Sequence, residues 1–179
     1  MTIVSPLTAR FAPCVFAVLG LISLAGCIDS AAPILTDGKP LLGERVHLQL
    51  YGVHGGAAHE PGSEIIAWRG DRYVRTGGPT KDIGDFSLHD FEGNDLLVQS
   101  FPGGKPVEYA LARRIADGTY LVFPIDETDA DEATRTKLCG KEAGAACRVT
   151  TRDQVLAFAR ATAAKPHSTG GLAIVMAER

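Results

Sequence analysis

Apolar and polar residues alternate along much of the chain after residue 44, and this alternation predicts β-strands. From 46 to 51 every second residue is apolar, a period of two that is typical of a strand with one buried face. Similar stretches follow at 65–69, 72–76, 86–91, 96–101, 107–115 and 120–125. Turns rich in Gly, Pro, Asn and Asp separate them, which is typical of an antiparallel meander.

After residue 125 the pattern predicts helices. The acidic stretch 126–132 precedes basic residues, an order that suits a helix dipole. Thr151 and Gln154 form a capping box ahead of apolar residues at helical spacing, and the helix ends before Pro166. The apolar run 171–177 predicts a last strand. The expected fold is therefore mainly β (α+β), an antiparallel meander forming a curved sheet or partly closed barrel, with two short helices near the C-terminus.

The first 26 residues have a different pattern, in which Arg10 is followed by an almost wholly apolar run from 11 to 25. This run is shorter than the roughly 20 apolar residues that span a bilayer, and its basic start is typical of a secretory signal peptide. It leads into Leu24-Ala25-Gly26-Cys27, which resembles the lipobox of bacterial lipoproteins. The resemblance implies cleavage before Cys27, a diacylglyceryl group on its thiol and, often, an acyl chain such as palmitate on its amine.

This resemblance divides the chain into a lipoprotein signal peptide at 1–26, a lipidated N-terminus and flexible tether at 27–43, and a single globular β-rich domain at 44–179. In enteric lipoproteins an Asp directly after the lipidated Cys favours retention in the inner membrane. Here Ile28 follows Cys27, so we expect the outer membrane rather than the inner one, with the domain facing the periplasm or the cell surface. A plain secretory signal or an uncleaved anchor is the alternative.

Composition argues against nucleic acid as a partner. Removal of residues 1–26 leaves 153 residues, a suitable size for one domain, with 17 basic and 21 acidic residues and a net charge of −4. Nucleic-acid binding needs a concentrated basic face, and the Lys and Arg residues here are scattered. The expected partner is membrane lipid, through acylated Cys27.

Two cysteines, Cys139 and Cys147, stay available once Cys14 leaves with the signal peptide and Cys27 is lipidated. In an exported domain such a pair is typical of a disulfide. A reactive dithiol or a metal pair is the alternative, but redox motifs usually place their cysteines two residues apart, and no nearby His or third Cys completes a metal site. We therefore predict a disulfide between Cys139 and Cys147.

His54 and His59 are the strongest candidates for metal chemistry. They flank a Gly-Gly-Ala-Ala loop that is flexible enough to fold two imidazoles onto one ion, with Glu60 and Glu64 nearby. The His-Glu-x-x-His signature of a zinc-binding helix is missing, so the sequence favours a solvated loop.

Other catalytic patterns are weaker. The acidic run 126–132 lacks the central Gly of a calcium-binding EF-hand loop, and the adjacent His167 and Ser168 are not expected to pair. None of the serines lies in a Gly-x-Ser-x-Gly context, and this includes Ser63, Ser87, Ser100 and Ser168. We therefore predict no catalytic residue, no cofactor and no resident metal, and the sequence favours a protein that is not an enzyme.

Aromatic side chains fall on most of the predicted strands, where core and cross-strand packing is their usual role. An aromatic ligand pocket inside the curved sheet is the alternative. The leading hypothesis is a lipid-anchored cell-envelope protein of unassigned activity, a non-enzymatic binding or structural module that contacts an envelope protein. The alternatives are a β-barrel that binds a small apolar ligand or lipid, and a metal-dependent hydrolase using His54 and His59.

Overall fold

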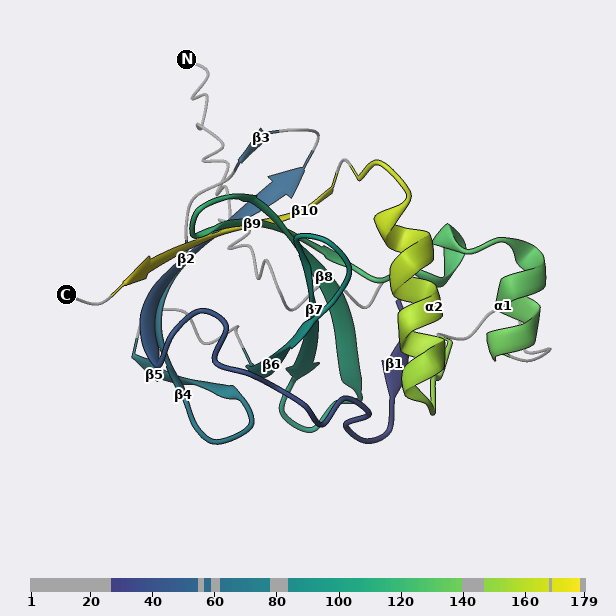
Figure 1. The fold of residues 1–179 in the computed structure, drawn as a ribbon, viewed down its shortest axis with the longest axis horizontal. Helices are drawn as coiled ribbons and strands as arrows, with labels where there is room; N and C mark the ends of the chain where they lie inside the picture. Colours follow the sequence, from purple (N-terminus) through teal and green to yellow (C-terminus); the bar gives the residue numbers. More distant parts are fainter. Residues whose placement is uncertain are drawn as a thin grey trace, which may run out of the picture.

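The chain folds as an antiparallel β-barrel with helices on one side (Figure 1). The computed structural model describes residues 27–54, 57–58, 62–77, 84–139, 147–167 and 169–177. The strands are β1 (Asp29–Ser30), β2 (Arg45–His54), β3 (Ala57–Ala58), β4 (Gly62–Trp68), β5 (Tyr73–Gly77), β6 (Asp85–Asp90), β7 (Asp95–Phe101), β8 (Val107–Ala116), β9 (Thr119–Pro124) and β10 (Thr169–Ala177). Between β9 and β10 lie a 3-10 turn, η1 (Glu127–Asp129), and the helices α1 (Glu132–Cys139) and α2 (Arg152–Ala163).

Eight of these strands form the barrel, and each pairs with its neighbour in chain order, from β2 through β4, β5, β6, β7, β8 and β9 to β10. The ring closes where β10 pairs with β2, from Thr169↔His54 to Ala177↔Val46. The short strand β1 continues along β8 beyond β9, and β3 pairs with β2. The predicted antiparallel meander is confirmed, and it closes fully rather than partly.

Both predicted helices are present, and α2 begins as the sequence indicates. The Thr151 side chain accepts a hydrogen bond from the backbone N–H of Gln154, and the Gln154 side chain accepts one from the backbone N–H of Thr151. This capping box satisfies N–H groups that a helix start leaves unpaired. The helix α1 buries no side chain, and its last residue, Cys139, forms the predicted disulfide with Cys147.

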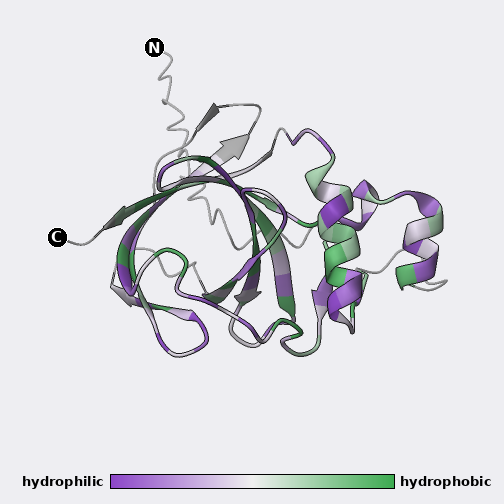
Figure 2. Cartoon of the chain, in the orientation of Figure 1, coloured by the Kyte–Doolittle hydropathy of each residue, from purple (hydrophilic) through white to green (hydrophobic). Residues whose placement is uncertain are grey.

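The barrel wall separates two apolar clusters. The inner cluster lies in the barrel and centres on Val46, Leu48, Ile66, Tyr73, Phe86, Leu88 and Ala173. The outer cluster lies between the wall and α2 and includes Leu97, Tyr109, Leu111, Phe123, Val155 and Phe158. Figure 2 shows the matching apolar stretches on the barrel strands and on α2. Because side chains alternate across a strand, the wall buries both of its faces on the helix side.

The segment that we predicted as a flexible tether is instead packed against the barrel. Ile28 and Leu35 are 0% and 3% exposed, and both belong to the outer cluster. Residues 31–44, which we call the strap, run across the outside of β7 and β6 and then enter β2. The tether is therefore corrected for residues 28–43, because two apolar side chains in this weakly patterned stretch find buried sites. The predicted signal peptide at 1–26 lies outside the described residues.

Candidate functional site

The inside of the barrel, its lumen, is the first candidate site. On β7, Leu96 and Val98 pack against the inner cluster, whereas Leu97 between them belongs to the outer one. Inward-facing Tyr73 and Leu88 are 0% and 3% exposed. Other inward-facing apolar side chains are only partly buried; they are Leu50, Leu96, Val98, Tyr120 and Val122. Because the ring of strands shields this face from the side, these side chains are exposed only through the interior and the ends of the barrel.

The two ends of the barrel differ. At the end where the strap enters β2, which we call the strap rim, Leu41 and Leu42 pack against the inner cluster. Tyr73 binds this part of the strap twice, since its hydroxyl accepts a hydrogen bond from Leu42 N–H and donates one to Gly43 O, both at 2.9 Å. The strap thus plugs its rim with apolar side chains.

We call the opposite end the Cys27 rim, because Cys27 bridges Asp126 just past the end of β9. Several of the inward-facing positions near this rim are small, and they include Gly52, Gly62, Ala110 and Gly171. They leave more room than the large side chains at the strap rim.

Charged groups also face the lumen toward the Cys27 rim. Glu64 on β4 is 0% exposed, and its Oε2 lies 3.9 Å from Nη1 of Arg75 on β5. Glu108, the second residue of β8, is partly buried, and this burial raises the pKa of its carboxyl group. The lumen therefore combines an apolar wall with polar groups toward one end.

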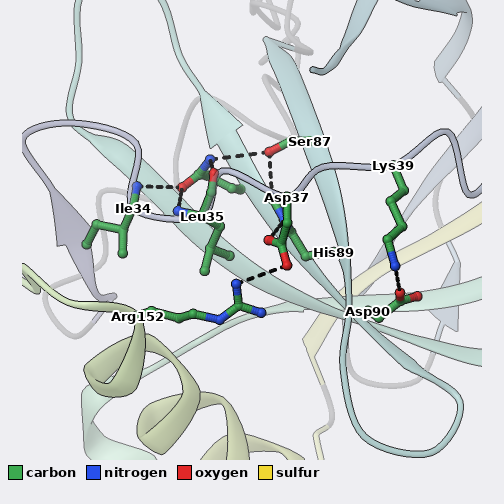
Figure 3. A network of polar contacts seen from close by, with 9 residues as sticks. Ile34, Leu35, Asp37, Lys39, Ser87, His89, Asp90 and Arg152 are labelled. Carbon is green, nitrogen blue, oxygen red and sulfur yellow. Dashed lines mark hydrogen bonds and ion pairs between the residues drawn. The ribbon is translucent and has the colours of Figure 1, made fainter. Parts of the chain in front are cut away.

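A second candidate is a chain of polar side chains on the outside of the barrel (Figure 3). Ser87 Oγ lies 2.8 Å from His89 Nε2, and His89 Nδ1 lies 2.9 Å from Oδ1 of Asp37 in the strap. Arg152 at the start of α2 donates to the other Asp37 oxygen at 2.9 Å. We call Asp37, His89 and Ser87 the relay. Its connectivity is that of a Ser-His-Asp catalytic triad.

Gln99 on β7 extends the relay into the strap. Its Oε1 accepts hydrogen bonds from the backbone N–H groups of Ile34 and Leu35, each at 2.9 Å. Its Nε2 donates to Leu35 O at 3.0 Å and to Ser87 Oγ at 3.3 Å. Ser87 then donates its own proton to His89 Nε2, which leaves Nδ1–H to donate to Asp37. Every partner is satisfied when the imidazole is neutral.

The charges around the relay agree with a neutral imidazole. Burial lowers the pKa of His89, although its hydrogen bond to Asp37 acts in the opposite direction. Burial acts to raise the pKa of Asp37, but hydrogen bonds from Arg152 and His89 outweigh it, so this pKa lies below its usual value. At neutral pH the relay therefore holds a carboxylate, an uncharged His89 and the Arg152 guanidinium.

The relay lacks the access that catalysis needs. Ser87 and His89 are 2% and 0% exposed, so no substrate carbonyl approaches the hydroxyl. The strap covers Ser87 so closely that a Cβ added at Gly38 would lie 3.3 Å from the Ser87 Cβ. No sequence motif marks Ser87 as a nucleophile, and the one local signal of the relay is that residues 87 and 89 share one face of a strand. We interpret the relay as a structural lock that joins the strap, β6 and α2.

Cys27 lies at a corner where three segments meet. Its backbone forms a β-bridge with Asp126. The N–H of Ile28 donates to Ile125 O at 3.2 Å, and the N–H of Asp29 donates to Cys147 O at 3.1 Å. Burial, followed by the charges of Asp126, Glu108 and Glu127, raises the pKa of the Cys27 thiol to about 11. An unmodified Cys27 is thus a protonated thiol at neutral pH and a poor nucleophile.

The metal candidates His54 and His59 stay a prediction, because His59 and the side chain of His54 lie outside the described residues. Among described groups, Glu127, Cys139 and Cys147 place ligand atoms within 4.8 Å of one another, but the two sulfurs are bonded to each other. Their lone carboxylate does not make a metal site. In the acidic run, Asp131 Oδ1 instead accepts a hydrogen bond from the backbone N–H of Thr134 at 2.7 Å, at the start of α1.

No family model, no curated protein and no solved structure matches this chain. Within the described ranges, no helix is both long and apolar enough to cross a membrane. The fold itself is a closed antiparallel β-barrel, an architecture compatible with a binding module.

The relay makes the stability of the protein depend on pH. In the unfolded chain His89 titrates near pH 6.5, whereas burial lowers its pKa in the folded state. Below about pH 6.5 the unfolded state therefore binds a proton that the folded state does not. The free energy of unfolding falls as the pH is lowered, by up to about 1.4 kcal/mol for each unit by which the pKa of His89 differs between the two states. We expect urea titrations from pH 8 to 5 to show this loss, and His89→Gln to remove it.

His167→Gln is the matched control, because His167 is an exposed residue outside the relay and its removal should leave the loss in place. The same pH slope in wild type and His89→Gln would contradict the assignment of this dependence to the relay.

The burial of Ser87 also predicts that the relay is chemically silent. After incubation with a fluorophosphonate, which phosphonylates activated serines, the intact mass of the native protein should not change. A serine hydrolase in the same tube checks the reagent. Modification mapped to Ser87 would show that the strap opens and that the relay is catalytic.

Proposed function

We propose that this protein is a lipid-anchored, non-enzymatic protein of the bacterial cell envelope, and that its barrel binds a small apolar or amphipathic ligand in the lumen. The partial exposure of inward-facing apolar side chains carries this proposal. Val98 lies at the middle of β7, and yet it is less buried than Leu97 on the outer face, which is 1% exposed. Apolar surface that stays wet inside a fold is stabilised when a ligand displaces that water.

The size of the barrel supports the same ligand class. Eight strands enclose an interior that is either filled by side chains or holds one small ligand. Here large side chains fill the strap end, whereas Gly52, Ala110 and Gly171 leave the other end less occupied. A ligand of this kind places its apolar part between the half-buried side chains.

The charged groups near the Cys27 rim support an amphipathic ligand over a wholly apolar one. The Glu64–Arg75 pair lies on the lumen side of neighbouring strands, and Glu108 faces the same end. The head group of an amphiphile hydrogen-bonds to such residues, while its chain extends toward Tyr73 and Phe86.

The anchor rests on the lipobox-like Leu24-Ala25-Gly26-Cys27. Two acyl chains suffice for stable membrane attachment, whereas one gives only marginal binding. The Cys139–Cys147 disulfide suits export, because disulfides persist outside the reducing cytosol. We place the domain in the periplasm or at the cell surface, on the outer rather than the inner membrane.

Expression in a lipoprotein-processing bacterium tests the anchor. The wild-type protein should lose residues 1–26, gain the mass of two or three acyl chains on Cys27 and fractionate with membranes. Cys27→Ala should carry no lipid mass and should leave the membrane fraction. An unmodified Cys27 in a protein that stays off the membrane would contradict the anchor and leave the ligand proposal to stand alone.

Trp68, the single tryptophan of the chain, reports on the lumen because it packs against the inner cluster and its ring centroid lies 5.1 Å from that of Tyr73. We expect a brominated fatty acid to quench Trp68 fluorescence in a saturable way, since bromine quenches only at close range. Ala110→Phe fills the lumen and should weaken this binding by at least about tenfold, or ~1.4 kcal/mol.

Ile115→Phe is the matched control, because Ile115 is 53% exposed on the same strand and its replacement should leave the affinity unchanged. Equal binding by wild type and Ala110→Phe would place the fatty acid outside the lumen and contradict the proposal.

A further inference from the structure

No flexible linker separates Cys27 from the barrel, because the described residues that follow it are packed and hydrogen-bonded. Ile28 is 0% exposed, and its N–H donates to Ile125 O at the end of β9. Both backbone groups of Asp29 are held, since its N–H donates to Cys147 O and its C=O accepts from Val149 N–H at 2.7 Å. Its carboxylate also accepts a hydrogen bond from Arg148 at 3.1 Å. A group attached at Cys27 is therefore attached to the body of the domain.

Strand register places this attachment at one end of the barrel. Cys27 bridges Asp126, two residues past the last residue of β9, and Ser30 pairs with Val107, the first residue of β8. In an antiparallel barrel the end of one strand and the start of its neighbour lie on the same rim. The acyl chains at Cys27 thus leave from the rim opposite the strap plug.

We propose that the Cys27 rim is a membrane-docking surface, so that the barrel stands on the bilayer with this rim toward the lipid and the strap rim away from it. The inference rests on the acylation of Cys27 under the proposed function. Its partner is the bilayer itself. A ligand that passes through this rim is then a membrane lipid or another amphiphile dissolved in the same leaflet.

The charges at the rim indicate which force holds it there. Burial and, after it, the negative charges of Asp126, Glu108 and Glu127 raise the pKa of the Cys27 thiol, so the charges near the attachment point are acidic. Such carboxylates repel anionic head groups over a Debye length of about 8 Å. Docking therefore depends on the acyl chains and the short attachment rather than on a basic patch, and zwitterionic phosphatidylcholine is the suitable bilayer for a test.

The test measures how close each rim lies to the lipid. Acylated protein carrying Lys105→Cys or Ile115→Cys is labelled with one fluorophore and reconstituted in phosphatidylcholine vesicles that contain head-group-near doxyl lipid. Lys105 is in the β7–β8 turn at the Cys27 rim, and Ile115 is close to the other end of β8. The label at position 105 should be quenched at least about fivefold more strongly, because the two sites lie roughly 25 Å apart along the barrel.

A linker variant separates docking from attachment. Sixteen Gly and Ser residues inserted between Cys27 and Ile28 give a root-mean-square reach of roughly 22 Å, and they should reduce quenching at position 105 to the level at position 115. Equal quenching at both positions without the linker, or undiminished quenching with it, would overturn the docking surface. The intact mass of each sample reports whether Cys27 is acylated, independently of the quenching. An unacylated Cys27 would overturn the anchor itself and, with it, this inference.

Discussion

Closure of the sheet between β2 and β10 is the constraint on which the rest of the structure depends. The continuous pairing from Thr169↔His54 to Ala177↔Val46 leaves neither strand with a free edge there. It also converts the alternation along every strand into an inside and an outside. On β7 and β8 the outward row is as apolar as the inward one, so the wall needs a second cover. The strap and α2 supply that cover.

The cover over β6 and β7 is polar as well as apolar, and this explains why a triad-like arrangement occurs without a triad's chemistry. Gln99, Ser87 and His89 are buried on the outer face, and buried polar groups need partners. The backbone of residues 34 and 35 and the carboxylate of Asp37 provide them. A catalytic serine instead faces substrate and lies beside donors for an oxyanion. The same hydrogen-bond geometry here orients a connecting segment.

The corner around Cys27 joins the proposed anchor to the stability of the fold. The Cys139–Cys147 disulfide holds the segment that pairs with Asp29, and Ile28 fills a site in the outer cluster. Ile28, the residue next to the proposed lipidation site Cys27, is thus also a core residue. Under the proposed anchor, the packing around Ile28 sets the orientation of the domain relative to the membrane, whereas a long flexible linker would leave that orientation free.

The sequence by itself determined the local elements. The period-two alternation predicted the barrel strands, Thr151 and Gln154 predicted the start of α2, and the Cys139–Cys147 pair predicted the disulfide. These features depend on residues close together in the chain. Only the tertiary structure decided that the sheet closes, that residues 28–43 pack against the barrel, and that Asp37 contacts His89, 52 positions away in the sequence. Such contacts form between surfaces that exist only after the barrel has closed. The segment 28–43 has few buried residues and they follow no regular spacing, so its sequence does not predict where it packs.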